Sequence, residues 1–487
     1  MLKLSDTGLF RTEAYVAGVW TGAAQRFAVF NPATQTEIAT VPNMGPGHVN
    51  EAVAAAAAAF PAWRGLTARE RSRILRRWFD LIMAHQEDLA CLITTEQGKP
   101  LAEARGEVAY AASFVEWFAE EAKRVYGDVI PHPDHGSRIV VLKQPIGVCA
   151  AITPWNFPAA MIARKAAPAL AAGCTMVVKP AEQTPLTALA LGELAERAGI
   201  PAGVLNIVTC DAASAPAVGA TLTGHEDVRK VTFTGSTQVG RILMRDSAVS
   251  IKKVSLELGG NSPFIIFDDA DLGAAVEGVM ASKFRNSGQT CVCANRIFVQ
   301  AGIYDRFVKH LGKAISRLNV GNGLEVGVNQ GPLIDIAGVE KVESHIADAV
   351  TKGARVVMGG SRHAKGGTFF EPTVLTGVTR EMRLFDEETF GPVAPLMRFE
   401  TEAQVIVLAN DSPFGLAAYL YSRDIGRAWR VAEELESGMV GVNAGFISNE
   451  VAPFGGIKQS GLGREGSYYG LEEYLEIKYL CMGGISQ

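Results

Sequence analysis

Cys291 and Cys293 stand close together in the segment RNSGQTCVCANR, residues 285–296. A cysteine thiolate is a strong nucleophile near neutral pH and attacks carbonyl carbon atoms. A zinc site needs further ligands, but the chain has no CxxC pair and no histidine cluster near a cysteine. A disulfide between the two is sterically marginal, because two residues of extended chain separate Cα atoms by about 6.5–7 Å. The pair therefore indicates a nucleophile with a neighbour, a strained disulfide, or two small buried residues.

Composition and charge narrow the range of partners. The chain has 487 residues, is 48% hydrophobic and 20% charged, and carries a formal net charge of −5. This length suits two or three domains, and the charge gives no reason to expect nucleic acid or an anionic membrane as a partner. The first residues lack the apolar core of a signal peptide, and the alanine run at 53–59 is too short to span a membrane. Seven scattered cysteines predict free thiols in a reducing cytoplasm and no metal site.

The elements that must position a reactive cysteine alternate regularly between strand and helix from residue 147 to residue 260. Valine-rich strand segments alternate with helical segments, which predicts a parallel sheet covered by helices on both faces. Polar motifs follow four of these strands, namely TPWN, KPAE, FTGS and LELGG. Because ligands bind at the carboxyl ends of parallel strands, we expect these motifs to meet at one edge. The usual G-x-G-x-x-G fingerprint of a dinucleotide site is missing after the first strand. The turn from Gly235 to Gly240 could bind a phosphate at a helix N-terminus, but a glycine turn with a serine cap explains it at least as well.

Other segments complete the expected architecture. Helical periodicity predicts helices at residues 49–60, 66–94 and 101–124. Thr67 is a plausible N-cap because Glu70 follows three residues later, as in a capping box. From about residue 261 the alternation resumes and predicts a second α/β domain. The terminal segment EEYLEIKYLCMG reads as a strand that pairs either with the strand expected at 138–145 or with another subunit.

Seven motifs occur in a characteristic order along the chain: TPWNFP, KPAEQTP, FTGST, LELGGNSP, GQTC, EETFGP and PFGGIKQSG. With these motifs the chain resembles the aldehyde dehydrogenase superfamily over nearly its full length. The segments FRNSGQTCVCANR, SNEVAPFGGIKQSGLGREG and YLEIKYLC resemble bacterial succinate-semialdehyde dehydrogenases more closely.

The resemblance implies a catalytic set. Cys291, directly after GQT, would be the nucleophile, and the Asn156 side-chain amide with the Cys291 backbone N–H would stabilise the oxyanion. Glu257 of LELGG would activate water for thioester hydrolysis, which suits a carboxylate whose pKa is raised by burial. On spacing alone, Glu257 could equally be a salt-bridged residue at a strand end. Glu465 and Lys165 match family positions thought to relay protons.

The resemblance also implies a nicotinamide dinucleotide as cofactor. The residues that would contact it are Trp155, Lys179, Glu182, Gly235, Ser236, Leu258, Glu388 and Phe390. Glu182 can accept from both ribose hydroxyls and would repel a 2′-phosphate, so NAD is favoured and NADP is the second possibility. Cys210 departs from the family pattern, where glycine is usual. If the backbone at that position has positive φ, we expect strain and weaker cofactor binding.

Two arginines and a serine match the carboxylate clamp of succinate-semialdehyde dehydrogenases. Arg164, Arg285 and Ser448 would bind the substrate tail, because a guanidinium fits a carboxylate with two hydrogen bonds. The implied reaction is oxidation of succinate semialdehyde to succinate, with glutarate semialdehyde as the alternative. A pocket distinguishes one methylene by only about 1–3 kcal/mol.

The expected subunit is α/β and has three parts. A Rossmann-like parallel-sheet cofactor domain comprises residues 1–125 and 146–259, and an α/β catalytic domain comprises 260–460. A small β oligomerisation ribbon comprises 126–145 and 470–487. The resemblance implies a homodimer or homotetramer that acts on a small-molecule aldehyde, and the cysteine usage places it in the cytoplasm.

Three other interpretations stay open at this point. An acylating enzyme would pass the thioester to coenzyme A, although Glu257 argues against this. A non-catalytic protein on the same fold would not need Cys291, Glu257 and Asn156 together. A cysteine hydrolase would need a histidine base, and no histidine lies near these motifs in the sequence. We further hypothesise that Cys293 shields Cys291 through a reversible disulfide.

Overall fold

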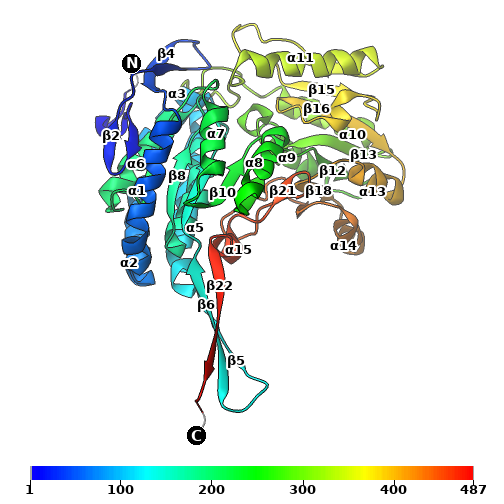
Figure 1. Ribbon diagram of the computed structural model, residues 1–487. Coiled ribbons are helices and arrows are strands. Elements are labelled where there is room, and N and C mark those ends of the chain that lie inside the picture. The colour runs from blue at the N-terminus through cyan, green and yellow to red at the C-terminus, as the bar shows by residue number, and fades with distance from the viewer. Residues whose placement is uncertain (1–2, 486–487) are drawn as a thin grey trace.

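The computed structural model describes residues 3–485, which form two α/β lobes and a projecting ribbon of strands (Figure 1). The first lobe is built on an eight-stranded sheet whose five central strands, β9, β8, β7, β10 and β11, are parallel, as the alternating sequence predicts. In order across the sheet, the strands are β2 (Val19–Thr21), β1 (Ala14–Val16), β9 (Leu205–Ile207), β8 (Thr175–Lys179), β7 (Val148–Ile152), β10 (Val228–Thr234), β11 (Lys253–Glu257) and β21 (Gly461–Leu462).

Eight helices accompany this sheet. They are α1 (Pro46–Gly65), α2 (Ala68–Ala84), α3 (Gln86–Gln97), α4 (Leu101–Glu121), α5 (Pro158–Ala172), α6 (Pro185–Ala198), α7 (Ala215–Gly224) and α8 (Thr237–Ser247). The single helix expected at 66–94 is wrong, because the chain leaves helical geometry at His85 (φ −107°, ψ 23°) and forms two helices. The capping box at the start of α2 is confirmed: Thr67 Oγ1 accepts from Glu70 N, and Glu70 Oε2 accepts from Thr67 N.

The second lobe has a seven-stranded sheet that is parallel except for β14. Its order is β14 (Arg355–Met358), β15 (Thr373–Thr376), β16 (Val393–Phe399), β13 (Ala294–Gln300), β12 (Ser262–Ile266), β18 (Ala417–Tyr421) and β19 (Met439–Val442). Its helices are α9 (Leu272–Lys283), α10 (Tyr304–Ile315), α11 (Ile336–Thr351), α12 (Arg383–Asp386), α13 (Glu402–Asn410) and α14 (Ile425–Glu434).

The ribbon consists of β5 (Asp128–Pro131), β6 (Ser137–Pro145) and β22 (Leu475–Gly483), and it extends away from both lobes (Figure 1). β22 pairs antiparallel with β6 along its whole length, which confirms one of the two pairings expected for the terminal strand. The short helix α15 (Ser467–Glu472) leads into β22. Two small pairs complete the strands: β3 (Arg26–Phe30) with β4 (Glu37–Pro42), and β17 (Phe414–Gly415) with β20 (Ile457–Lys458).

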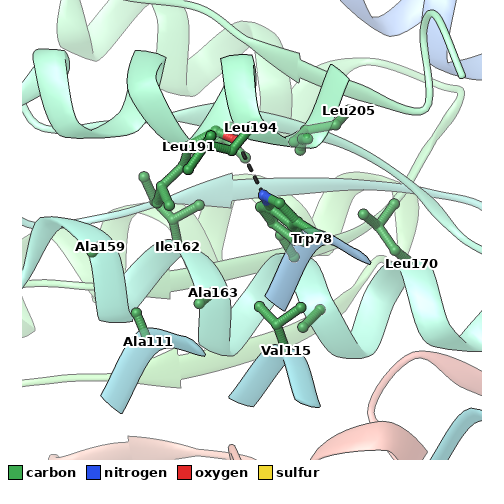
Figure 2. Packing of buried hydrophobic residues seen from close by; sticks show 14 of the residues in the cluster. Trp78, Ala111, Val115, Ala159, Ile162, Ala163, Leu170, Leu191, Leu194 and Leu205 are labelled. Atoms are coloured by element: carbon green, nitrogen blue, oxygen red, sulfur yellow. Dashed lines mark hydrogen bonds between the residues drawn. The ribbon is translucent and has the colours of Figure 1, made fainter. Parts of the chain in front are cut away.

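A large apolar core holds the first lobe together. Trp78 of α2 is fully buried against alanine, valine, isoleucine and leucine side chains of α4, α5 and α6 (Figure 2). Its indole N–H donates to the Leu191 carbonyl at 3.2 Å, so the polar end of the ring is also satisfied. This packing fixes α5, the helix that begins immediately after the TPWN motif. Within residues 3–485, no helix is both long and apolar enough to cross a membrane.

Candidate active site

Three of the four polar motifs of the first sheet, TPWN, FTGS and LELGG, meet residues of the second lobe at a cavity of about 380 Å³, and the fourth, KPAE, does not line it. This volume is in the range of small-molecule pockets, which is about 300–1,000 Å³. Nine of the expected site residues line it: Trp155, Asn156, Gly235, Ser236, Glu257, Leu258, Cys291, Glu388 and Phe390. Five do not: Arg164, Lys179, Glu182, Arg285 and Ser448.

Cys291 lies between the 3₁₀ turn η4 (Arg285–Gly288) and β13, with partial exposure toward the cavity. Burial raises the pKa of its thiol to about 12, although the positive charge of Arg164 acts in the opposite direction. The thiol must therefore give up its proton, to solvent or to a nearby carboxylate, before it attacks. Asn286 and Gln289 of this loop are buried and hydrogen-bonded to each other.

Cys293 has different surroundings from Cys291. It is fully buried, and its sulfur is 3.6 Å from the Lys283 carbonyl oxygen, toward which the thiol donates. Both cysteines are free thiols in this structure. A shielding disulfide between them stays a prediction.

Glu257 is the last residue of β11, and both of its carboxylate oxygens are buried without a hydrogen-bond partner. Burial and then repulsion from Glu465 raise its pKa well above the ordinary value. Gly455 is required beside it, because a Cβ at residue 455 would lie 2.9 Å from Glu257 Oε1. A buried carboxylate with free lone pairs, in the same cavity as a thiol, can accept a proton from the thiol or from water.

Asn156 follows β7 and is buried at the base of the cavity wall. Its side-chain N–H donates to the Gln289 carbonyl at 3.1 Å, two residues before the nucleophile. The amide is therefore already directed toward the Cys291 loop, where an oxyanion donor is needed.

The opposite part of the cavity presents groups suited to a dinucleotide. Gly235 and Ser236 lead into α8, and Ser236 also caps this helix by accepting from Val239 N at 3.3 Å. Glu388 is half-buried, and its removal from water raises its pKa to about 7. Gly259 leaves room beside it, because a Cβ there would lie 3.0 Å from Glu388 Oε2. A helix N-terminus, a carboxylate and an open glycine backbone fit a phosphate and a ribose.

Two aromatic residues form another wall of the cavity. Trp155 and Phe390 meet edge to face, with ring centroids 5.6 Å apart. Phe390 has a φ of 57°, a left-handed conformation that is unusual for an aromatic residue. Such strain is concentrated at functional sites, where the surrounding structure over-determines the backbone.

Lys179 and Glu182 stand at the end of β8 and form an ion pair at 3.4 Å. The Glu182 side chain keeps 27% of its surface exposed, so solvent can reach its carboxylate. Cys210 is buried near these two residues, and its backbone does not have the positive φ that would cause strain. The backbone strain that we considered for this substitution is therefore absent.

A compact charged cluster lies beyond Glu257. Glu465 pairs with Lys165 and, at 2.7 Å, with Arg164, and Lys165 also donates to Thr234 Oγ1 at 2.7 Å. Burial alone would raise the pKa of Glu465, but the two cations bring it below its ordinary value. The salt bridge that was the alternative role for Glu257 is instead formed by Glu465. Glu257 has no ion-pair partner among residues 3–485.

Arg285 is placed differently from Arg164. Its guanidinium lies over the rings of Phe157, at 5.1 Å, and Phe446, at 4.8 Å. Among residues 3–485 its side chain has no acidic ion-pair partner within 4.0 Å. Ser448 is buried in the loop that follows β19.

Several other residues line the cavity although no sequence motif predicts them. Ile334, Asp335, Gly338 and Lys341, at the start of α11, line the cavity, and Lys341 lowers the pKa of Glu388. His345 on the same helix contacts Thr389 Oγ1 at 3.1 Å, so a histidine does lie beside the EETFGP motif. It does not line the cavity that contains Cys291. The segment 334–345 has no distinctive motif, and only the fold brings it to the site.

Comparisons with known proteins agree with this geometry. Residues 20–480 match the model of the aldehyde dehydrogenase family. The chain is 65% identical to a glutarate-semialdehyde dehydrogenase of Pseudomonas aeruginosa, over 99% of this chain and 100% of that protein. It is 63% identical to succinate-semialdehyde dehydrogenase [NADP(+)] of Escherichia coli K12, with the same two coverages. The crystal structure of succinate-semialdehyde dehydrogenase from Burkholderia pseudomallei superposes with a TM-score of 0.97 at 63% identity, covering 99% of this chain and 100% of that one.

The chain belongs to the aldehyde dehydrogenase family. It is an enzyme that oxidises aldehydes with a nicotinamide dinucleotide, NAD or NADP, as the hydride acceptor.

Proposed function

We propose that this enzyme oxidises succinate semialdehyde to succinate, with glutarate semialdehyde as the alternative substrate. The two aldehydes share a terminal carboxylate and differ by one methylene. The similar relatives carry both names, one glutarate-semialdehyde and one succinate-semialdehyde dehydrogenase. The common feature is an anionic tail, and the observation that carries the proposal is an arginine suited to bind it.

That arginine is Arg285. Its guanidinium is flanked by two aromatic rings and lacks an ionic partner among residues 3–485. Aromatic faces hold the planar group without neutralising it, so its charge remains available to a carboxylate. Arg285 does not line the cavity, but its positive charge acts to lower the pKa of the Cys291 thiol, which places the two groups near each other.

Arg164 would have a shared role in substrate binding. It is buried over the ring of Phe454 at 4.0 Å and is already paired with Glu465. A substrate carboxylate would therefore share this guanidinium with Glu465. Among residues 3–485, Arg285 has no carboxylate within 4.0 Å and interacts only at longer range with Glu103. We expect loss of Arg285 to raise the substrate KM more selectively than loss of Arg164, which would also disturb the cluster beside Glu257.

The chemistry follows from the cavity residues. Cys291 releases its proton to solvent and its thiolate attacks the aldehyde carbon, so that the carbonyl π bond breaks and the oxygen of the thiohemiacetal becomes an oxyanion stabilised by the Asn156 amide. The dinucleotide supplies a hydride acceptor when bound. Glu257 then takes a proton from water, which attacks the thioester and releases the acid from Cys291. The unpartnered carboxylate favours this hydrolytic route over transfer to coenzyme A, which needs no water-activating base.

The proposed binding groups for the dinucleotide are Ser236 at the α8 N-terminus, Glu388, and the Lys179–Glu182 pair. The negative charge of Glu182 predicts a preference for NAD, whereas the name of the 63% identical relative from Escherichia coli favours NADP. Because Lys179 and solvent both reduce the effective charge of Glu182, we propose that NADP is accepted as well as NAD. A Glu182→Ser variant should then shift the kcat/KM ratio toward NADP by about tenfold or more.

Steady-state kinetics test the substrate assignment. We expect kcat/KM to be highest for succinate and glutarate semialdehydes, and at least about tenfold lower for butanal, which lacks the carboxylate. Arg285→Met should remove this advantage while leaving the rate with butanal nearly unchanged. An equal loss with charged and uncharged aldehydes would contradict the tail-binding role. The same assays with added coenzyme A detect any acyl transfer.

The cell compartment is a further proposal. Seven free cysteines, most of them buried, are consistent with a cytoplasmic enzyme.

A further inference from the structure

Helix α4 contacts both loops that carry the proposed reacting groups. Two of its carboxylates, Glu103 and Glu107, are one helical turn apart and therefore lie on the same side of the helix. Glu107 reaches the loop of Asn156, and Glu103 reaches the loop of Cys291. Neither carboxylate lines the cavity, so neither touches the reacting atoms.

Glu107 caps α5 from a neighbouring helix. The N-cap residue of α5, Phe157, has no side-chain oxygen to accept from the first free amides. Glu107 Oε1 accepts from Ala159 N at 2.9 Å and from Ala160 N at 3.4 Å. A buried carboxylate at a helix N-terminus satisfies these amides and interacts favourably with the helix dipole. The start of α5, and with it the preceding Asn156, is thereby tied to α4.

Lys99 extends this contact to Asn156 itself. Its ammonium forms a buried ion pair with Glu107 and donates to the Asn156 carbonyl at 2.7 Å. The ammonium also lies 3.9 Å from the centre of the Phe157 ring. Burying two charges is expensive unless each is fully paired, and here the pairing directs one donor at the backbone of the proposed oxyanion residue.

Glu103 holds the other loop. Its carboxylate accepts from Asn286 N at 2.7 Å, where Asn286 and Ser287 have φ values of 51° and 56°. Two consecutive non-glycine residues in the left-handed region are strained and need external support. The Asn286 side chain in turn donates to the Asn156 carbonyl at 3.1 Å and to the Gln289 carbonyl at 3.2 Å.

We propose that Lys99, Glu103 and Glu107 form a positioning clamp that sets the Asn156 amide against the Cys291 loop. The Asn156 carbonyl joins the two contacts, because both the Lys99 ammonium and the Asn286 side-chain amide donate to it. The clamp acts only through these loops. This inference rests on the proposed role of Asn156 in stabilising the oxyanion.

The clamp predicts a specific kinetic effect for Lys99→Met. Loss of the ammonium leaves the Asn156 carbonyl with one donor, so the amide shifts relative to the oxyanion. We expect kcat to fall about tenfold to a hundredfold, since displacements near 1 Å have effects of this size. The KM for the dinucleotide should stay within about threefold, because no hydrogen bond joins Lys99 to Ser236 or Glu388 among residues 3–485. The KM for the aldehyde is a less specific measure, because the Phe157 ring contacts both Lys99 and Arg285.

A double-mutant cycle with Asn156→Ala separates positioning from general damage. Alone, Asn156→Ala should lower kcat by about 10²–10³-fold. If Lys99 acts through the Asn156 amide, adding Lys99→Met to Asn156→Ala should lower kcat no further. If the two losses multiply, Lys99 acts by another route and the clamp is refuted. If Asn156→Ala keeps wild-type kcat, the proposed oxyanion role itself fails, which is a distinguishable result.

Glu96→Gln is the matched control. Glu96 is also a fully buried carboxylate that caps a helix, accepting from Leu186 N and Thr187 N of α6, each at 2.8 Å. It should lower the unfolding temperature as Lys99→Met does, but leave kcat at saturating substrates unchanged. A kcat loss in Glu96→Gln equal to that in Lys99→Met would overturn the proposal. If Lys99→Met does not fold, Glu103→Ala enters the same cycle, with the same non-additivity expected.

Discussion

At the scale of single residues, Glu257 gives the sharpest kinetic prediction. Its buried oxygens have no hydrogen-bond partner, which leaves them free to activate water. Replacement by glutamine removes the base but not the Cys291 nucleophile. We expect Glu257→Gln to keep a rapid burst of about one equivalent of NAD(P)H per site, while steady-state turnover falls by about 10²–10⁴-fold. Stopped-flow absorbance measures both phases.

Glu465→Gln serves as the comparison for this variant, because Glu465 is paired with Lys165 and Arg164 and is not free to act as a base. Glu465→Gln should keep the burst and should lose less steady-state turnover than Glu257→Gln. If the burst itself disappears in Glu257→Gln, Glu257 is needed before hydride transfer, as the base for the thiol, and the assignment to hydrolysis alone is wrong.

Glu388 predicts a pH dependence of cofactor binding. Burial raises its pKa to about 7, so the carboxylate form needed to accept from ribose hydroxyls is lost as the pH falls through 7. The KM for the dinucleotide should therefore rise below neutral pH and level off above it. Lys341 lowers the pKa of Glu388, so Lys341→Ala should move the midpoint to higher pH. Glu388→Gln should have a higher KM without this dependence; a midpoint that persists in it would assign the titration to another group.

The cavity residues that the sequence predicts have a common property. Each lies beside a strand end or in a short motif that carries the family resemblance. Lys341 and Glu103 have no such signal. Glu103 acts on Asn286 across 183 positions of sequence, through a hydrogen bond that only the packing of α4 creates. The pairing of Arg164 with Glu465 also joins distant parts of the sequence, so no local pattern indicates it.

At the scale of elements, α2 shows how the core supports the site. Trp78 is fully buried between α4, α5 and α6, and α5 and α4 carry the contacts around Asn156 (Figure 2). We expect Trp78→Ala to reduce the free energy of unfolding by about 3–5 kcal/mol, through lost burial and the cavity left behind. Urea unfolding followed by circular dichroism measures this change.

Trp429 on α14 is the control for Trp78, because 67% of its surface is exposed. Trp429→Ala should change the free energy of unfolding by no more than about 0.5 kcal/mol. Similar losses for both tryptophans would mean that the α2 interface contributes little to stability.

The alternation of strands and helices predicted the parallel sheet of the first lobe and the α/β character of the second, since hydrophobic patterning is a local property that survives in the fold. Local reasoning failed where tertiary contacts decide. The pattern at 66–94 continues through His85, but the chain bends there to pack α3 separately from α2. Likewise β21, only two residues long, adds to the first sheet from a segment after the second lobe, and no period in the sequence marks it.

At the scale of the whole molecule, the ribbon is the part whose apolar side chains the single chain leaves exposed. β5, β6 and β22 form a sheet on their own, and in Figure 1 they extend well beyond the body of the protein. Nearly every residue of β22 is exposed, including Ile477 at 73% and Tyr479 at 58%, and Val129 of β5 is 74% exposed. Apolar side chains exposed together on projecting strands mark an interaction site. We propose that a second copy of the chain covers them.

Charge placed on the ribbon should therefore separate the subunits. We expect the wild-type enzyme to be a dimer or tetramer at micromolar concentration, and Ile477→Asp with Tyr479→Asp to shift it to a smaller species, as measured by light scattering after gel filtration. The reason is that two buried carboxylates without partners would oppose association by several kcal/mol. Ile425→Asp, at an 80% exposed position on α14 away from the ribbon, should keep the wild-type mass. A monomeric wild-type enzyme, or a doubly substituted ribbon that still assembles fully, would show that these strands are not the interface.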